Sequence, residues 1–323
     1  MFWHLLKYPG SCYAKYMSNK PENGKRTTVL ITGHTGFIGH HLVRHIQRLD
    51  PDVRLEGFYR SSGENIRDYA PLLSRVRAVN LVINLAGTSR PDRGWSNPHE
   101  TYETDALGAI TIMEACKNSN VPLIHISSSE VYGTNIHQGY PMPESHPLHP
   151  KNPYGVAKKA SDEAALTYID DGVPIALLRL FTPYGTGEVD PFHHFIPRLV
   201  RQAITGGDLP VTDGGVRRRD WIFAEDIAEA IWEARNASPD VYNIARGVLY
   251  SDLEVALLVL KEVKEVFPTK SRILPLSSQT PLNDPLEQLG DPVRFFEETG
   301  WHAHTSLEEG IRQCIAFYTK TSA

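Results

Sequence analysis

The sequence predicts an α/β protein with a doubly wound parallel sheet. Short runs rich in Val, Ile and Leu alternate with helical patterns between residues 27 and 180, which is typical of βαβ units. The first run is followed at once by a glycine-rich turn and a helical pattern. A length of 323 residues is enough for one large domain or two modest ones. We therefore expect a parallel sheet with helices on both faces.

The elements are predicted from local patterns of apolar residues. The run from Thr28 to Thr32 is short and β-branched, and Leu42, Val43 and Ile46 recur at helical spacing after the turn. By the same criteria we expect strands at 28–32, 53–59, 78–85, 122–126 and 175–180. We expect helices at 40–49, 102–118, 154–170, 226–236 and 252–266.

The composition excludes several classes of protein. The chain carries 33 Lys and Arg against 38 Asp and Glu, a formal net charge of −5, whereas a general nucleic-acid-binding protein shows a basic excess. No run approaches the roughly 18 apolar residues that span a bilayer, so we expect no membrane association. Cys12, Cys116 and Cys314 lie far apart and predict neither a disulfide framework nor a metal cluster. We expect a cytoplasmic protein without a metal site.

The first predicted strand runs directly into the sequence TGHTGFIG at 32–39. Gly33, Gly36 and Gly39 would let the backbone turn tightly and approach a pyrophosphate, which the N–H groups of the following helix attract. Because the spacing is GxxGxxG, the alternative is a tight structural turn. We favour a dinucleotide site in a Rossmann-type domain. Its further cofactor contacts are expected at Thr35, Phe37, Ile38, Leu85, Ala86 and Gly87.

The strand–helix rhythm loosens after about residue 181, where Pro and Gly-Gly turns become frequent. We expect a loosely ordered leader at 1–26, a dinucleotide-binding domain at 27–180 and a smaller mixed α/β substrate domain at 181–323. Some segments of the last region should return to the sheet of the second. An alternative for the leader is a docking arm for a partner chain.

The second predicted strand indicates which dinucleotide binds. Enzymes that use NAD place an acidic residue at its end, to accept hydrogen bonds from the ribose hydroxyls. Here the strand ends with Arg60, Ser61 and Ser62. A guanidinium assisted by a serine hydroxyl could hold a 2′-phosphate, so we favour NADP over NAD. The alternative is that Arg60 is solvated and either cofactor binds.

Tyr154 and Lys158 are four residues apart in a predicted helix, so they share one face. A neighbouring ammonium lowers the pKa of a phenol from about 10, which suits Tyr154 to general acid–base catalysis. Lys158 could also bind the cofactor ribose. The pair follows a serine run, 127–129, at the end of a predicted strand, where parallel sheets place their sites.

These motifs occur in one order along the chain: TGxxGFIG, SSxxVYG at 127–133, YxxxK, Arg219-Asp220 with Asp226, and Gly300-Trp301. In this combination the chain resembles the extended short-chain dehydrogenase/reductases of the nucleotide-sugar epimerase/dehydratase family. The resemblance covers about residue 27 to the C-terminus. It implies NAD(P) as cofactor, a nucleotide-diphosphate sugar as substrate, and a homodimer built from the helices at 102–118 and 154–170.

The resemblance also implies roles for single residues. Tyr154 and Lys158 match the catalytic pair, and Ser128 matches the serine or threonine that binds the reacting sugar oxygen. The remaining implied substrate contacts are Ser129, Thr182, Arg219 and Arg294. Two positions depart from the family pattern, because Asp105 and Thr182 stand where Asn is usual.

Glu130 bears on which reaction is catalysed. It matches the glutamate that 4,6-dehydratases of this family use to remove the C5 proton, and we therefore favour a nucleotide-sugar 4,6-dehydratase. The alternatives are an NADPH-dependent reductase of 4-keto-6-deoxy sugars, which Arg60 favours, and a 4-epimerase. A non-catalytic dinucleotide-sensing protein is a further alternative, although such relatives usually lack the Tyr or the Lys.

Overall fold

The computed structural model describes residues 26–88, 90–187, 194–277 and 284–321. Nearly all of the expected leader, together with Cys12, lies outside the described residues. Within the described part, no helix has the length and apolar character needed to cross a membrane. The same residues contain no cluster of His, Cys, Asp or Glu that could hold a metal ion.

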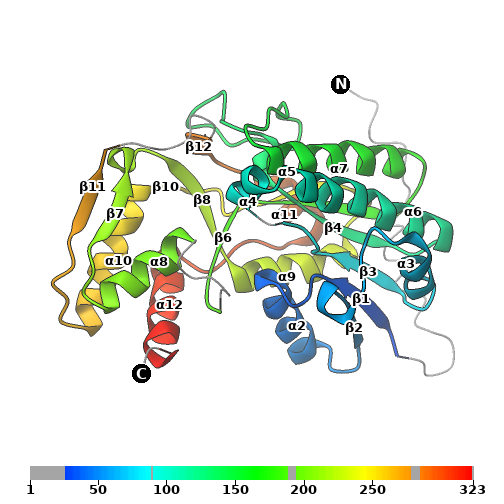
Figure 1. Cartoon of the computed structure of the whole chain (residues 1–323), viewed down its shortest axis with the longest axis horizontal. Coiled ribbons are helices and arrows are strands. Elements are labelled where there is room, and N and C mark those ends of the chain that lie inside the picture. Colours follow the sequence, from blue (N-terminus) through cyan, green and yellow to red (C-terminus); the bar gives the residue numbers. More distant parts are fainter. Residues whose placement is uncertain (1–25, 89, 188–193, 278–283, 322–323) are drawn as a thin grey trace.

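Six parallel strands form the main sheet, in the order β2-β1-β3-β4-β5-β9 (Figure 1). The chain winds outward in both directions from the boundary between β1 and β3, and this confirms the predicted fold class. The strands are β1 (Thr28–Thr32), β2 (Arg54–Phe58), β3 (Leu81–Asn84), β4 (Leu123–Ser128), β5 (Ile175–Leu180) and β9 (Asp240–Ile244).

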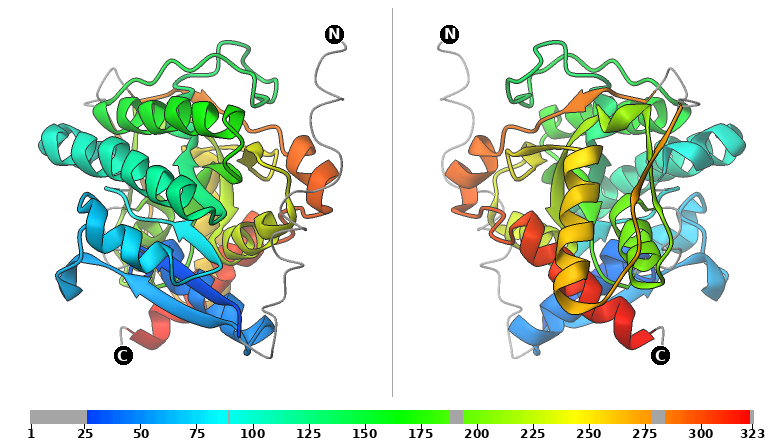
Figure 2. Two further views of the ribbon diagram at one scale, coloured as in Figure 1. Left: turned by 90° about the vertical axis from the view of Figure 1, so that its right-hand side faces the viewer. Right: turned by 90° about the vertical axis from the view of Figure 1, so that its left-hand side faces the viewer.

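Helices cover both faces of this sheet. One face packs against α2 (Phe37–Leu49), α9 (Ala224–Glu233) and α11 (Val293–Thr299). The other face packs against α3 (Tyr69–Val76), α6 (Ala109–Ser119) and α7 (Pro153–Asp170), of which α6 and α7 lie side by side (Figure 2). Strand alternation explains the two cores, because Val29 and Ile31 of β1 enter the first while Leu30 enters the second.

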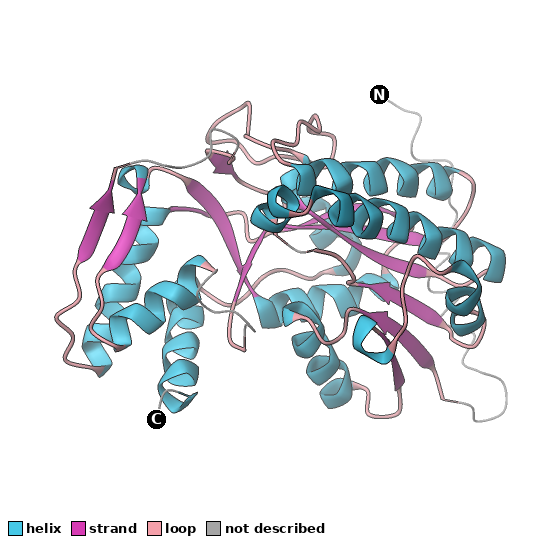
Figure 3. Cartoon of the chain, in the orientation of Figure 1, coloured by secondary structure: helices cyan, strands magenta, loops and turns pink. Residues whose placement is uncertain are grey.

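Further described strands and helices form a smaller mixed region, on the left in Figure 3. Strand β8 (Arg218–Phe223) pairs with β6 (Thr182–Tyr184), β10 (Leu249–Ser251) and β12 (Glu287–Gln288). A second pair joins β7 (Leu209–Thr212) and β11 (Ile273–Leu276). An apolar cluster packs these strands against α8 (Phe195–Ile204), α10 (Asp252–Val266) and α12 (Leu307–Thr321).

Several short helical segments connect these elements. They are η1 (Arg60–Ser62), α4 (Pro91–Ser96), α5 (Pro98–Thr101), η3 (Ser129–Val131), η4 (Asp213–Gly215) and η5 (Ala234–Asn236). The segment η2 (Tyr102–Gly108) is a π-helix that runs into α6. The sequence predicted one continuous helix over 102–118, so the π-helical turn corrects that prediction. Since π-turns rarely persist without a local reason, η2 marks a place to look for function.

Candidate active site

A cavity of about 940 Å³ lies at the carboxyl ends of β1, β3 and β4. Its opposite wall comes from β6, β8 and the start of α8. The carboxyl ends on either side of a switch point are where open α/β sheets bind their ligands. The volume lies in the upper part of the range for small-molecule and cofactor sites.

The glycine-rich loop forms one end of the cavity. Gly33 has a positive φ of 68°, and a Cβ added there would lie 2.9 Å from the backbone N of Ala86. Gly36 is the N-cap of α2, whose first turn contains no acidic residue. The first turn of α2 therefore offers N–H groups that have no partner within the helix and the positive end of a helix dipole, which fit a pyrophosphate. All the cofactor contacts predicted from this loop and from β3 line the cavity: Gly33, Thr35, Gly36, Phe37, Ile38, Gly39, Leu85, Ala86 and Gly87.

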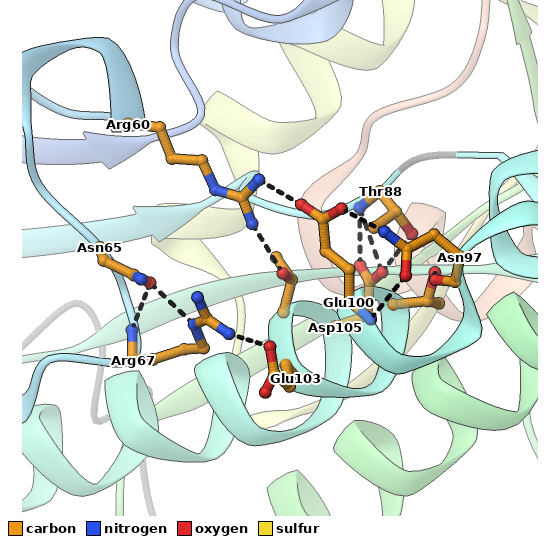
Figure 4. Close-up of polar contacts among 10 residues, drawn as sticks. Arg60, Asn65, Arg67, Thr88, Asn97, Glu100, Glu103 and Asp105 are labelled. Carbon is orange, nitrogen blue, oxygen red and sulfur yellow. Dashed lines mark hydrogen bonds and ion pairs between the residues drawn. The ribbon is translucent and has the colours of Figure 1, made fainter.

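Arg60 also lines the cavity, and its guanidinium already has protein partners (Figure 4). One nitrogen pairs with Glu100 of α5, and another donates to Thr104 Oγ1 at 3.1 Å. The hydrogen bond from Arg60 lowers the pKa of Glu100. Ser62, expected to assist Arg60, instead donates to Tyr59 O at 2.6 Å. The side chain of Ser61 lies outside the described residues.

Tyr154, Ser128 and Lys158 all line the cavity. The Lys158 ammonium lies 5.9 Å from the centre of the Tyr154 ring and donates to Ile126 O at 3.1 Å. Burial and then the charge of Asp105 raise the pKa of the Tyr154 phenol, while its interaction with Ser128 lowers it. The lowered pKa expected from the sequence is therefore wrong for this structure, because burial and a buried carboxylate outweigh the lysine.

Glu130 faces the same cavity two residues after Ser128. Its carboxylate accepts a hydrogen bond from Asn152 Nδ2 at 2.7 Å. Burial raises the pKa of Glu130, and the charge of Arg219 acts in the opposite direction. Asn152 also caps α7, since its Oδ1 accepts from Gly155 N at 2.8 Å. One side chain thus connects Glu130 to the helix that carries Tyr154.

The predicted substrate residues separate into two groups. Ser129, Thr182 and Arg219 line the cavity. Arg219 donates to Asp284 Oδ1 at 2.9 Å, so a carboxylate holds its guanidinium at the cavity wall. Arg294 lies on α11, pairs with Asp240 of β9 and is not among the described residues that line the cavity. The structure therefore does not bring Arg294 together with the other predicted residues, because a nearer carboxylate takes its guanidinium.

Sequence reasoning missed several wall residues. Asn65 and Ile66 follow β2, and Trp221 follows the predicted Arg219 by two positions along β8. The alternation of a strand could have indicated Trp221, since residues two apart share a face. The other missed wall residues come mainly from loops and short helices, and they include Thr88, Arg90, Arg93, Glu100, Thr104, His194, Phe195 and Asp284.

The positions of these groups define the class of protein. A glycine-rich loop at the switch point and a Tyr–Lys pair on α7 face one cavity, as in Rossmann-type enzymes that use a nicotinamide dinucleotide. The model of the NAD dependent epimerase/dehydratase family matches residues 29–245, which is more than half of the chain. This protein belongs to that family of enzymes.

Individual relatives agree with this membership. The chain is 27% identical to a probable dTDP-glucose 4,6-dehydratase of Sinorhizobium fredii, over 90% of this chain and 92% of the relative. It resembles the structure of MoeE5 in complex with UDP-glucose and NAD, with 26% identity, a TM-score of 0.78 and coverage of 92% and 100%. A UDP-glucose 4-epimerase of Thermotoga maritima shares the fold, with a TM-score of 0.80, 21% identity and coverage of 92% and 100%.

Proposed function

We propose that this protein is a nucleotide-sugar 4,6-dehydratase. The observation that carries the proposal is Glu130, a partly buried carboxylate in the same cavity as Ser128 and Tyr154. Removal of the C5 proton requires such a base, whereas inversion at C4 does not. The relative from Sinorhizobium fredii, which is named a probable dTDP-glucose 4,6-dehydratase, supports the same choice.

The chain supplies the proton transfers. Tyr154, in its deprotonated form, takes the proton of the C4 hydroxyl, and Ser128 holds that oxygen. A nicotinamide dinucleotide held by the glycine-rich loop and Lys158 would supply the hydride acceptor for C4 and the hydride donor for C6. Glu130 takes the C5 proton and passes a proton to the C6 hydroxyl, which leaves as water. C5 then regains a proton, and Tyr154 gives up the proton that it took from the C4 hydroxyl. With exchange of protons with solvent, both Glu130 and Tyr154 return to their starting states. The net change is the loss of one water.

A mass measurement tests the proposal directly. We would incubate the protein with dTDP-glucose, UDP-glucose and GDP-mannose, with NAD or NADP added, and expect one substrate to lose one water. Glu130→Gln should abolish this loss while still allowing oxidation at C4. Glu163→Gln is the matched control, because Glu163 is a half-exposed residue of α7 outside the described cavity wall. Full dehydration by Glu130→Gln would end the proposal.

A second candidate is an NADPH-dependent reductase of a 4-keto-6-deoxy nucleotide sugar. Arg60 in the cavity wall favours it, since a guanidinium suits a 2′-phosphate. Such an enzyme would leave the mass of every hexose unchanged and would oxidise NADPH when given the keto sugar. If neither reaction occurs, nuclear magnetic resonance of the sugars would detect 4-epimerisation.

NADP is the cofactor that we propose, with Arg60 as its determinant. NAD is present in the complex of the similar protein MoeE5, so discrimination has to be measured here. Arg60→Ala should weaken NADP(H) binding at least tenfold more than NAD(H) binding, because only the former offers a phosphate to the guanidinium. Arg67→Ala is the control, since Arg67 pairs with Glu103 and is absent from the described cavity wall. Equal losses for both cofactors would contradict the assignment.

A homodimer in the cytoplasm is the state that we propose for the enzyme. Tyr102, Leu107, Val156 and Leu166 are exposed apolar residues on η2 and α7, where the resemblance predicts the contact. Sedimentation should give twice the chain mass for the native protein, and Leu107→Asp should shift it towards the monomer. Cys116 is a buried free thiol, which agrees with a reducing compartment. Cell fractionation would test that location.

A further inference from the structure

Asp105 lies in the π-helical turn η2, next to Lys158 of the proposed catalytic pair Tyr154–Lys158. It is 1% exposed. Its two carboxylate oxygens accept from Thr88 N at 3.2 and 3.1 Å, and Oδ2 also accepts from the Thr88 hydroxyl (Figure 4). Its Oδ1 lies 3.3 Å from Lys158 Nζ. A carboxylate that is removed from water in this way needs these partners to stay charged.

Gly87 provides the room for this ion pair. A Cβ at position 87 would lie 2.3 Å from Asp105 Oδ1 and 3.2 Å from Lys158 Nζ. Any larger residue would push the carboxylate away from the ammonium. The glycine after β3 therefore serves the Asp105–Lys158 pair as well as the cofactor cavity that it lines.

The pair changes the charge that Tyr154 meets. A free ammonium near the ring would favour the phenolate. A carboxylate 3.3 Å from that ammonium largely cancels its field at the phenol. The other groups that face the phenol are Ser128, Glu130 and Asp162, and the two carboxylates among them disfavour a further negative charge.

We propose that Asp105 is a positioning residue that holds the Lys158 ammonium in an ion pair and offsets its charge at the Tyr154 phenol. Asparagine, which the resemblance leads one to expect at this position, could accept a hydrogen bond from Lys158 but would leave its charge intact. The inference rests on the proposed roles of Tyr154 and Lys158 at C4, which the dehydratase, reductase and epimerase share.

The test is the pH dependence of C4 oxidation in a single turnover, followed by the absorbance of the reduced nicotinamide. The probe is the sugar nucleotide that reacts in the panel described above. In Asp105→Asn, the rise of the rate with pH should move down by about one pH unit, which is about a tenfold faster oxidation on the acidic side. Thr88→Val removes one hydrogen bond to Asp105 but keeps the charge, so its profile should stay in place.

Two further variants separate this inference from other outcomes. Gly87→Ala should move the profile in the same direction as Asp105→Asn, and it tests the idea if Asp105→Asn does not fold. Glu130→Gln should stop dehydration while oxidation at C4 can still be followed, so failure of the dehydratase proposal leaves this one standing. If no sugar reacts, the absorbance of tyrosinate can be titrated with pH instead. The part of this absorbance that is missing in Tyr154→Phe belongs to Tyr154. In Asp105→Asn it should appear at a lower pH than in the native protein. A rate lowered equally at every pH, or an unmoved tyrosinate titration, would overturn the inference.

Discussion

Two buried ion pairs, Lys158–Asp105 and Arg179–Asp162, use side chains one turn apart on α7. Lys158 Nζ lies 3.3 Å from Asp105 Oδ1, and Arg179 Nε donates to Asp162 Oδ2 at 2.8 Å. All four side chains are almost entirely shielded from water. Their desolvation is therefore similar, and differences in what the pairs do have to come from their surroundings.

The two pairs differ in whether they border the cavity. Arg179 donates further to Tyr132 OH at 2.8 Å and Glu144 O at 2.9 Å, and neither it nor Asp162 is among the described wall residues. Lys158 lines the cavity beside Tyr154. A buried pair whose donors all end on protein groups contributes to structure. A buried pair that borders a cavity can act on a bound substrate.

The largest expected effect is at Tyr154, next to the Lys158–Asp105 pair that borders the cavity. Tyr154→Phe should lower the rate of C4 oxidation by about 10²- to 10⁴-fold, because the group that takes the proton is gone. Dinucleotide affinity, measured by fluorescence titration, should change less than twofold. Tyr168→Phe, elsewhere on α7, should leave the rate unchanged. Cellular function that survives in Tyr154→Phe would instead favour a non-catalytic dinucleotide-sensing protein.

Breaking the Arg179–Asp162 pair, which lies away from the described cavity wall, should affect stability more than the chemistry at Tyr154. Arg179→Met should lower the free energy of unfolding by about 3–5 kcal/mol, because it leaves Asp162 charged, buried and unpaired. Urea unfolding measures this. Arg54→Met is the control, since its pair with Glu56 is exposed on the arginine side and should contribute less than about 1 kcal/mol. If the pH profile of C4 oxidation shifts in folded Arg179→Met as it does in Asp105→Asn, the distinction between the two pairs is contradicted.

A third buried carboxylate, Asp220, sharpens the comparison because backbone groups hold it. It accepts from the N–H groups of Arg246, Gly247 and Gly290 at 3.0, 2.8 and 3.3 Å. Burial raises the pKa of Asp220 to about 7. The folded state then binds this proton more tightly than the unfolded state, so stability should fall as pH rises from about 4 to 7 and level off above.

This contribution corresponds to about 4 kcal/mol across that window. Urea unfolding at pH 4.5 and 7.5 measures this contribution. The free energy of unfolding of the native protein should fall between the two pH values, and that of Asp220→Asn should not. The same fall in both proteins would mean that Asp220 does not titrate in this range.

A smaller effect is expected where α4 touches Tyr154. A Cβ at Gly94 would lie 2.8 Å from Tyr154 N and 3.0 Å from Tyr154 Cβ. Gly94→Ala should destabilise the protein by about 1–3 kcal/mol through overpacking, and it should slow C4 oxidation by displacing Tyr154. Gly207→Ala is the control, because the contacts of its added Cβ are 3.5 Å or longer. A faster or unchanged C4 oxidation in Gly94→Ala would show that α4 moves to accept the added methyl group without displacing Tyr154.

The smallest effect is expected at Arg294. Its pair with Asp240 is partly exposed and lies away from the described cavity wall. Arg294→Ala should change stability by less than about 1 kcal/mol and leave nucleotide-sugar affinity within twofold. Arg219→Ala, measured by the same calorimetric titration, should weaken that affinity at least tenfold. A comparable loss of affinity in Arg294→Ala would support the substrate contact that the resemblance implies for Arg294.

Prediction from sequence succeeded where the pattern is local. The runs at 28–32, 175–180 and 252–266 have the predicted ends, and the glycine loop lies where its motif expects it. The spacing of Tyr154 and Lys158 places both side chains on the cavity side of α7. The predicted strand at 78–85 is shorter in the structure, and α3, whose short pattern was not recognised, precedes it.

By itself, then, the sequence determined the sheet, the cofactor loop and the Ser–Tyr–Lys group, because alternation, helical spacing and glycine turns act over a few residues. The tertiary structure decided which charges meet. Glu100 with Arg60, Asp240 with Arg294 and Asp105 with Lys158 are pairs of residues 40 or more positions apart in the chain. Whether Lys158 lowers the pKa of Tyr154 depends on burial and on that third pair. No pattern along the chain encodes these, since desolvation and ion pairing arise only once distant segments pack together.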